Sequence, residues 1–385
     1  MSVRVLQVYR TYYPDTRGGI EEVMRQIALA VRPQGVETTL FTLSPRPRPA
    51  VLERPEGRVV RARSWAAPAS CDLGGVAALR QFARLAAQAD LIHLHFPWPF
   101  ADVLLAAVRP RAPVVVTYHS DVVRQQLLAR FYAPLMWRTF ARARAVVATS
   151  PPYAATSAVL QDERVRDKVR VIPLGMDEAS LAQGDEGILD RLGLRPEEPF
   201  ALFVGGLRYY KGLETLLEAA RGLPGRVVIA GEGPEGATLR ARAEALGLEN
   251  VVFAGRVSDA EKAALLRACR LVVLPSPLRS EAFGMVLVEG AMCGKPLVSC
   301  EIGTGTTFVN VAGETGLVAP PGNAAALHAA LARLLRDEGL AQRLGQGARR
   351  RYEEIFSGEA LGAAYAALYA EVVRPRQDVG REGRP

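Results

Sequence analysis

Short apolar runs alternate with longer amphipathic stretches along almost the whole chain. In the first half the apolar runs occupy residues 3–8, 38–43, 91–95, 114–118 and 145–149. The pattern restarts in the second half, at residues 201–204, 227–230, 251–254, 271–274, 297–300 and 316–318. Strands that alternate with helices of about 10–15 residues are typical of parallel α/β sheets. The two series therefore predict an α/β protein with two Rossmann-like β/α/β domains that face each other across a cleft.

A turn that contains proline and glycine separates the two series. The sequence VIPLGMD at residues 171–177 ends a strand, and we expect the domains to close about it as a hinge. Residues 1–172 are predicted to form the N-terminal domain and residues 173–356 the C-terminal domain. The last amphipathic helix, at about residues 357–373, is predicted to return to the N-terminal domain, and residues 374–385 are predicted to form a flexible tail.

Composition narrows the class of protein. The 385 residues are 49% apolar with a net charge of +8, which suits two folded domains and excludes wholesale disorder. No apolar run approaches the length of about 18 residues that a membrane-spanning helix needs, and the N-terminus lacks the apolar core of a signal peptide. The four cysteines form no CxxC pair, which disfavours a zinc site. We therefore expect a cytoplasmic protein.

Basic side chains are concentrated in the first half of the chain. Residues 1–172 carry 24 basic and 13 acidic side chains, whereas residues 173–385 carry 24 and 27. This balance permits a membrane phosphate, nucleic acid or an anionic substrate as partner. Residues 124–145 mix five arginines with large apolar side chains. They form either a peripheral contact with an anionic membrane or a core helix whose arginines face solvent.

In such sheets ligands bind in the loops that follow the strands. Gly18 and Gly19 begin the first helix, where bare backbone favours an anion, although an ordinary turn explains them equally well. The loop GGLRYYKG at residues 205–212 brings Arg208 and Lys211 to the start of a helix, which suits a diphosphate. Solvated surface charges are the alternative, and the spacing is not that of a P-loop.

The sequence GEGPEG at residues 231–236 matches the dinucleotide fingerprint GxGxxG. It follows an internal strand, and no acidic residue ends the next strand, so a nicotinamide oxidoreductase is disfavoured. A tight turn, with Gly231 and Gly233 beside a nucleotide or merely within the turn, explains the match better.

The loop and helix SEAFGMVLVEGAMCGKP at residues 280–296 carry two carboxylates, Glu281 and Glu289. Eight helical residues would separate them by about 12 Å, which is too far for a glycosidase pair at about 5–9.5 Å. They suit separate hydroxyl groups of one elongated ligand, with the backbone amides of Phe283, Gly284 and Met285 facing a phosphate. The alternative is a solvated carboxylate and one that the helix dipole favours. The chain contains no DxD and no HExxH sequence, so metal-dependent handling of a diphosphate is disfavoured.

In combination, these motifs resemble the retaining family 4 glycosyltransferases of GT-B fold, over the chain up to about residue 373. The motifs are the two glycines at 18–19, the loop at 205–212, GEGP at 231–234 and Glu281-x7-Glu289. The stretches TYHSDVVRQ at 117–125, LRYYKG at 207–212 and CEIGTGTTFVN at 300–310 are further similar to the mannosyl- and rhamnosyltransferases of bacterial O-antigen assembly.

The resemblance implies a role for each matching position in the second domain. Glu281 would bind hydroxyls of the donor sugar, and Glu289 would bind the ribose hydroxyls. Arg208 and Lys211 would hold the pyrophosphate and stabilise the leaving nucleoside diphosphate. Many members carry Arg directly after the glycine at 205, where this chain has Gly206, and we expect Arg208 to substitute for it.

The same resemblance implies that the backbone near Arg256 and Val257 meets the base and that His119 faces the sugar, often through its hydroxymethyl group. From the residues alone, a core histidine is an equal alternative for His119. The implied reaction retains the anomeric configuration: the acceptor hydroxyl attacks on the face that the diphosphate leaves, and a phosphate oxygen takes its proton.

The resemblance therefore implies a metal-independent hexosyltransferase without a cofactor, which uses a nucleoside-diphosphate sugar, preferably GDP-linked mannose or rhamnose. The acceptor would be a saccharide, lipid-linked at the inner face of the cytoplasmic membrane, in cell-surface polysaccharide biosynthesis. A UDP-hexose-dependent transferase and a UDP-N-acetylglucosamine epimerase of the same fold are the enzyme alternatives. A non-catalytic scaffold that binds nucleic acid or lipid is disfavoured, because both glutamates and Lys211 are present.

Overall fold

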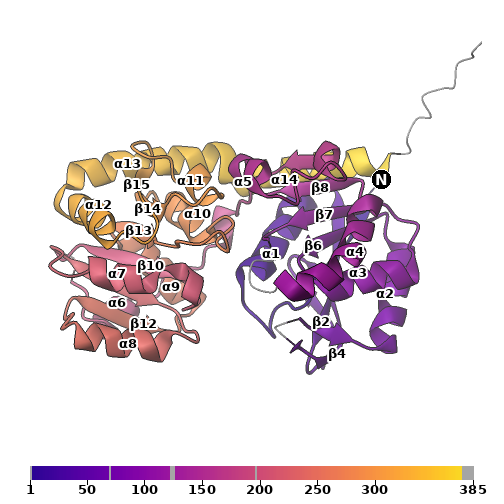
Figure 1. Cartoon of the computed structure of the whole chain (residues 1–385), viewed down its shortest axis with the longest axis horizontal. Helices are drawn as coiled ribbons and strands as arrows, with labels where there is room; N and C mark the ends of the chain where they lie inside the picture. The colour runs from indigo at the N-terminus through magenta and orange to yellow at the C-terminus, as the bar shows by residue number, and fades with distance from the viewer. Residues whose placement is uncertain (1, 69–70, 122–125, 196, 375–385) are drawn as a thin grey trace, which may run out of the picture.

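The computed structural model describes residues 2–68, 71–121, 126–195 and 197–374, which form two lobes joined along one side (Figure 1). Each lobe is built on a mainly parallel sheet with helices on both faces. Each apolar run expected from the sequence lies in a strand, apart from Thr149, which directly follows the strand Ala145–Ala148. The prediction of two Rossmann-like domains in a GT-B arrangement is confirmed. Within the described residues, no helix is both long and apolar enough to cross a membrane.

The sheet of the N-terminal lobe has the strand order β3-β4-β2-β1-β6-β7-β8-β9, and β5 pairs with β4. Most of the inner strands are buried on both faces, as parallel strands between helix layers require. The strands are β1 (Val3–Val8), β2 (Val36–Ser44), β3 (Val51–Arg54), β4 (Gly57–Ala66), β5 (Leu73–Gly74), β6 (Leu91–Phe96), β7 (Val114–Tyr118), β8 (Ala145–Ala148) and β9 (Val169–Val171). The helices are α1 (Gly19–Val31), α2 (Val76–Gln88), α3 (Pro99–Val108), α4 (Gln126–Arg142) and α5 (Pro151–Thr156).

The sheet of the C-terminal lobe has the order β12-β11-β10-β13-β14-β15, and its neighbouring strands are parallel. The strands are β10 (Phe200–Val204), β11 (Arg226–Ala230), β12 (Val251–Gly255), β13 (Leu271–Leu274), β14 (Leu297–Cys300) and β15 (Gly316–Ala319). The helices are α6 (Gly187–Arg191), α7 (Leu213–Ala219), α8 (Gly236–Ala245), α9 (Asp259–Ala268), α10 (Met285–Met292), α11 (Thr306–Val309), α12 (Ala324–Arg336) and α13 (Glu338–Arg351). The strand order reverses between β10 and β13, and ligands bind at the carboxyl ends of strands at such a switch point.

The chain crosses between the lobes twice, at neighbouring places. Residues 171–177 lead out of the first lobe, and the chain returns after α13 into α14 (Gly358–Val373), which lies on the first lobe (Figure 1). Met176 N–H donates to Phe356 O at 2.9 Å, so the two crossings are hydrogen-bonded together. The Ser357 side chain caps α14 by accepting from Ala360 N–H at 3.2 Å. On the first lobe, Tyr365 and Tyr369 of α14 are buried.

Candidate active site

Lys211 and Glu281 form a buried ion pair at the carboxyl ends of β10 and β13. Lys211 ends a single 3-10 turn after β10, and Glu281 lies in the loop between β13 and α10. Their side chains are only 14% and 11% exposed, and Ser276 Oγ also donates to Glu281 Oε2, at 3.2 Å. Burial disfavours the lysine charge, but the Glu281 carboxylate outweighs it and raises the pKa of Lys211. A permanent cation is thereby fixed at the switch point.

Glu289 has a lysine partner of its own. It lies in α10 with its side chain 9% exposed, and Lys262 Nζ of α9 donates to its Oε1 at 2.7 Å. Burial disfavours the Lys262 charge, yet the Glu289 carboxylate raises the pKa of Lys262. Glu281 and Glu289 are thus two separately neutralised carboxylates, and the contacts use Glu281 Oε2 and Glu289 Oε1. The second oxygen of each can accept a ligand hydroxyl.

Backbone groups at the start of α10 lie between these two carboxylates in the sequence. Gly284 precedes the helix in the left-handed conformation, at φ +88°, and a Cβ there would meet Leu274 Cδ2 at 2.6 Å. No side chain caps the helix at this residue. The Phe283 ring is 4% exposed and packs edge-on against Phe356, so Phe283 presents its backbone rather than its ring. Met285, the first helical residue, is half-buried.

The glycines after β11 serve the close approach of two loops. Gly231 adopts φ +139°, and a Cβ there would lie 2.0 Å from Gly205 O. A Cβ on Gly233 would lie 2.4 Å from Leu207 O. The tight-turn interpretation of GEGPEG thus has a direct packing reason, since only glycine lets this loop lie against the Lys211 loop.

Two arginines near these loops are exposed. Arg256 pairs with Glu232 at 3.0 Å, and its side chain is 83% exposed, while its neighbour Val257 is half-buried. Arg208 is exposed, and it lies near enough to Lys211 to disfavour the lysine charge. Among the described residues no group pairs with Arg208, so this guanidinium is available to an anion.

In the first lobe, His119 follows β7, and Gly18 and Gly19 lie at the start of α1. His119 is 6% exposed. A Cβ on Gly19 would meet nothing within 4 Å, whereas one on Gly18 would lie 2.5 Å from Glu21 Oε2. Glu21 Oε1 itself accepts from Thr11 Oγ1 at 2.9 Å and holds the loop that precedes the helix. The Gly19 backbone therefore faces open space.

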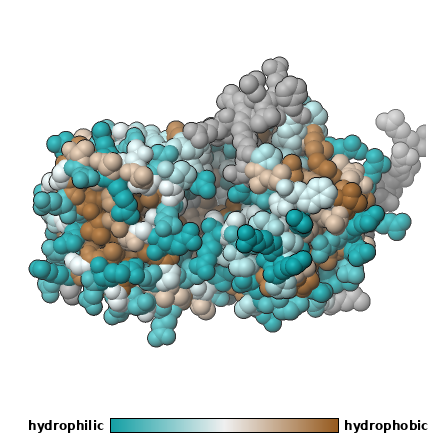
Figure 2. Space-filling model, turned by 90° about the horizontal axis from the view of Figure 1, so that it is seen from below, coloured by the Kyte–Doolittle hydropathy of each residue, from teal (hydrophilic) through white to brown (hydrophobic). Residues whose placement is uncertain are grey.

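Arg279 connects the two lobes beside the site, and sequence reasoning missed it. Its Nη1 donates to Thr156 Oγ1 of α5 at 3.0 Å, and its Nη2 pairs with Asp121 at 3.5 Å. Asp121 lies two residues after His119, and Arg279 lies two residues before Glu281. The pair therefore brings the His119 loop and the Glu281 loop together. Seen from below, the surface is hollowed between the two lobes (Figure 2).

The arginine-rich segment 124–145 lies partly outside the described residues. In its described part, Met136 and Phe140 of α4 are buried in the core of the first lobe. The Arg164 guanidinium lies 3.6 Å over the Trp137 ring. Met136 and Phe140 therefore pack inward, as in the core-helix alternative.

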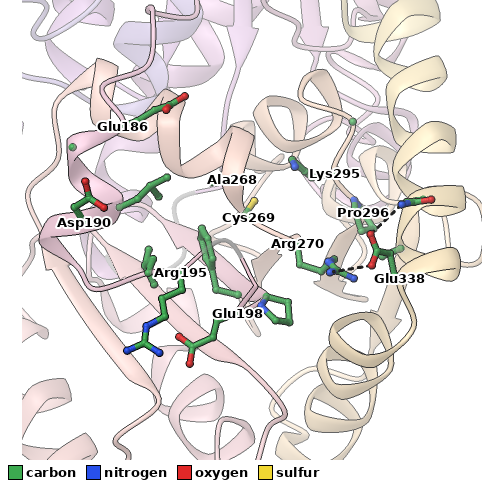
Figure 3. A pocket seen from close by; sticks show the side chains of 18 residues that line it. Glu186, Asp190, Arg195, Glu198, Ala268, Cys269, Arg270, Lys295, Pro296 and Glu338 are labelled. Atoms are coloured by element: carbon green, nitrogen blue, oxygen red, sulfur yellow. Dashed lines mark hydrogen bonds and ion pairs between the residues drawn. The ribbon is translucent and has the colours of Figure 1, made fainter.

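Figure 3 shows a cavity of about 690 Å³. It lies at the amino ends of the C-terminal strands, whereas Lys211 follows the carboxyl end of β10. None of the predicted site residues lines it. Its charges are mixed, and Arg270 pairs there with Glu338 at 3.6 Å. The cavity is therefore separate from the candidate active site.

The site combines two neutralised carboxylates, a fixed lysine, an exposed arginine and bare backbone at a sheet switch point. This set can bind a polyhydroxylated anion such as a sugar diphosphate. Two family models match the chain: "Glycosyltransferase Family 4" over residues 17–180 and "Glycosyl transferases group 1" over residues 186–351. The chain belongs to the family 4 glycosyltransferases.

The sequence of the chain is similar to those of curated glycosyltransferases over most of its length. It is 41% identical to O-antigen chain mannosyltransferase C of Escherichia coli, over 97% of this chain and 100% of the relative. It is 45% identical to the D-rhamnosyltransferase WbpZ of Pseudomonas aeruginosa, over 92% of each chain. The structure of a sucrose-phosphate synthase from Thermosynechococcus elongatus has a TM-score of 0.77 at 25% identity, over 96% of this chain and 98% of the synthase.

Proposed function

We propose that this glycosyltransferase transfers a mannosyl or rhamnosyl residue, with retention of configuration, from a GDP-linked donor to a saccharide acceptor in cell-surface polysaccharide synthesis. The relatives named mannosyltransferase and rhamnosyltransferase support the hexosyl group. The observation that carries the proposal is the buried Lys211–Glu281 pair, which places a cation and a hydroxyl acceptor side by side at the switch point.

In this proposal the second lobe holds the donor. Lys211, with Arg208 from the exposed side, neutralises the diphosphate, and the backbone of Phe283–Met285 donates to a phosphate oxygen. Glu281 binds hydroxyls of the sugar, and Glu289 binds the ribose. The backbone at Gly231, Gly233, Arg256 and Val257 lies beside the base, and that at Gly18 and Gly19 lies beside the donor from the first lobe.

The chemical step then needs positioning and charge stabilisation. The acceptor oxygen bonds to the anomeric carbon on the face from which the GDP oxygen departs, and a phosphate oxygen of the leaving group takes the acceptor proton. Lys211 and Arg208 stabilise the negative charge that develops on GDP, so we propose that neither a metal ion nor a cofactor is needed.

Replacement of Glu289 tests where the nucleoside binds. Glu289→Ala removes the carboxylate proposed for the ribose hydroxyls, and we expect GDP to bind about 10–100-fold more weakly, since charge-assisted hydrogen bonds contribute about 1.5–3 kcal/mol. Calorimetric titration measures the affinity, and thermal-shift screening against GDP, UDP and ADP identifies the base. The exposed Glu249→Ala is the matched control. Unchanged GDP affinity in Glu289→Ala would refute this placement, and a preference for UDP would refute the GDP-linked donor.

We further propose that the acceptor is lipid-linked and that the first lobe contacts an anionic membrane on the cytoplasmic side. The excess of basic over acidic side chains in residues 1–172 supports this contact. So does an apolar tip formed by Trp65, Leu73 and Val76, where Trp65 is 70% exposed and Val76 58%. The tip is one unit, because β5 pairs with β4 and the Trp65 ring packs over Gly75.

Vesicle flotation tests the membrane contact. We expect the protein to float with anionic vesicles at low salt and to be released at high salt, because salt screens the attraction between the arginines and the anionic lipids. Trp65→Ser should reduce the bound fraction several-fold, since an interfacial tryptophan is lost. The comparable exposed change Tyr209→Ser, in the other lobe, should leave flotation unchanged. If the wild type does not float with anionic vesicles at low salt, the proposed membrane contact is wrong.

A further inference from the structure

A stripe of buried polar side chains runs beneath His119, on the face of the first sheet that α14 covers. Gln7 of β1, His93 and His95 of β6, and Thr117 of β7 are all at most 1% exposed. β6 lies between β1 and β7, and the registers place Gln7 opposite His93 and His95 opposite Thr117. Burying a polar group costs free energy unless the group is hydrogen-bonded. The hydrogen-bond partners in this stripe therefore indicate which atoms donate and which accept.

The stripe divides into two hydrogen-bonded branches. In one, Gln7 Oε1 lies 3.0 Å from His95 Nε2, and His95 Nδ1 lies 2.8 Å from His119 Nε2. The His95 and His119 rings are inclined by only 15°, which suits a bond in the ring planes. In the other branch, His93 bonds to Tyr369 OH at 2.8 Å and to Thr117 Oγ1 at 2.7 Å. Only the first branch reaches His119.

The first branch has a direction. Burial lowers the pKa of His95 well below its usual value and that of His119 to about 3, so both rings are neutral and each carries one N–H. Gln7 Oε1 can only accept, so the His95 proton is on Nε2 and its Nδ1 is an acceptor. His119 must then donate from Nε2. Its Nδ1 is left as an acceptor, and among the described residues no group bonds to it.

We propose that Gln7 and His95 are positioning residues that hold His119 in the Nε2–H tautomer and present its Nδ1 as a hydrogen-bond acceptor for a hydroxyl of the donor sugar. The ligand half of this inference rests on the proposed function. The tautomer half rests on the two hydrogen bonds, on the burial that keeps both rings neutral and on the orientation of the Gln7 amide.

Ring ¹⁵N NMR of the histidine-labelled protein tests the tautomer without any ligand. The chain has four histidines, so four rings give signals. His328 is an internal reference of the opposite kind, because its Nδ1 lies 2.9 Å from the carbonyl of Ala219 and must carry the proton. We expect His119 to show a protonated Nε2 and a bare Nδ1. The amide nitrogen of Gln7 has no hydrogen-bond partner in the described part of the chain. If the oxygen and nitrogen of the Gln7 amide were exchanged, every donor and acceptor of this branch would change roles and His119 would carry its proton on Nδ1. A protonated Nδ1 on His119 would therefore overturn the proposal.

Two matched variants separate positioning from stability. His95→Phe removes the acceptor of His119, and we expect its ring to become a mixture of tautomers. His93→Phe, on the same strand and the same face, should leave the His119 tautomer unchanged. If the His119 signals are the same in wild type and His95→Phe, the proposal fails. Should the variants not fold, the wild-type spectrum still decides the tautomer.

Donor kinetics then test the ligand half. A hydroxyl of the sugar hydroxymethyl group is present in GDP-mannose and absent from the 6-deoxy sugar of GDP-rhamnose. We expect His95→Phe to raise KM for GDP-mannose about tenfold, as loss of one hydrogen bond would, and to leave KM for GDP-rhamnose nearly unchanged. Equal effects on both donors would overturn the hydroxyl contact. Failure of the wild type to use either donor, with the expected tautomer, would overturn the proposed function and leave the positioning of His119 intact.

Discussion

Lys211→Ala should lower kcat for sugar transfer by about 10²–10³-fold, which is the scale measured when one preorganised charge-stabilising donor is removed. Lys211 is buried and kept cationic by Glu281. In the proposed reaction its charge is therefore already in place when negative charge develops on the leaving diphosphate. The substitution also leaves the Glu281 carboxylate unpaired in a buried site, which should disturb sugar binding as well. Release of the nucleoside diphosphate, proposed to be GDP, in the presence of acceptor measures the rate.

The chain supplies a close control for this experiment. Lys295 is another of its four lysines and lies in the same lobe, but it lines the cavity at the amino ends of the strands (Figure 3). Lys295→Ala should retain full activity. Lys211→Arg, which keeps the charge with a different shape, should recover part of the rate. Near-normal kcat in Lys211→Ala would mean that the diphosphate is neutralised elsewhere.

Most strands of both sheets could be predicted because parallel strands between two helix layers are continuous apolar runs. The β3–β4 hairpin could not be predicted, because its strands are not continuous apolar runs. Its strands lie near the sheet edge and carry Arg54, Arg58, Arg61 and Arg63, so the apolar pattern is broken. Arg61 is nevertheless 3% exposed, because it pairs with Asp15 at 3.0 Å. A partner that is 46 residues away in the chain cannot be recognised from local pattern.

The candidate site also contains residues that local sequence reveals and contacts that it does not. Lys211 and Glu281 could be predicted from their loops, because ligand-binding residues of such folds lie in the loops that follow the carboxyl ends of the strands. The lysine partner of Glu289, the Arg279–Asp121 bridge and the Gln7–His95–His119 branch could not, because each joins segments that are distant in sequence. The apolar side chains of α4 show the reverse case. The sequence left a membrane contact and a core helix open, and the basic charge of the first half favoured the membrane contact. Only packing shows Met136 and Phe140 in the core.

Stability should fall steeply as the pH drops from about 6 to 5, with a slope set by four buried groups of the first lobe. Burial lowers the pKa values of His93 and His119 to about 3 and that of His95 well below its usual value. By pH 5, well below the usual histidine pKa of about 6.5, the unfolded chain therefore binds almost three protons that the folded chain does not. Asp102 opposes them, because burial raises its pKa to about 7 and the folded chain takes up that proton first.

The net difference is two protons, so the free energy of unfolding should decrease by about 3 kcal/mol per pH unit in this window, at about 1.4 kcal/mol per proton. Asp102→Asn keeps an acceptor for Tyr132 and removes the opposing proton, so it should steepen the fall to about 4 kcal/mol per unit. His93→Phe removes one histidine and should flatten it to about 1.4 kcal/mol per unit. Urea unfolding at several pH values measures the slopes. Tryptophan fluorescence is a suitable probe, because Trp65, Trp98 and Trp137 all lie in the first lobe. A slope that neither variant changes would show that these groups do not titrate as their burial requires.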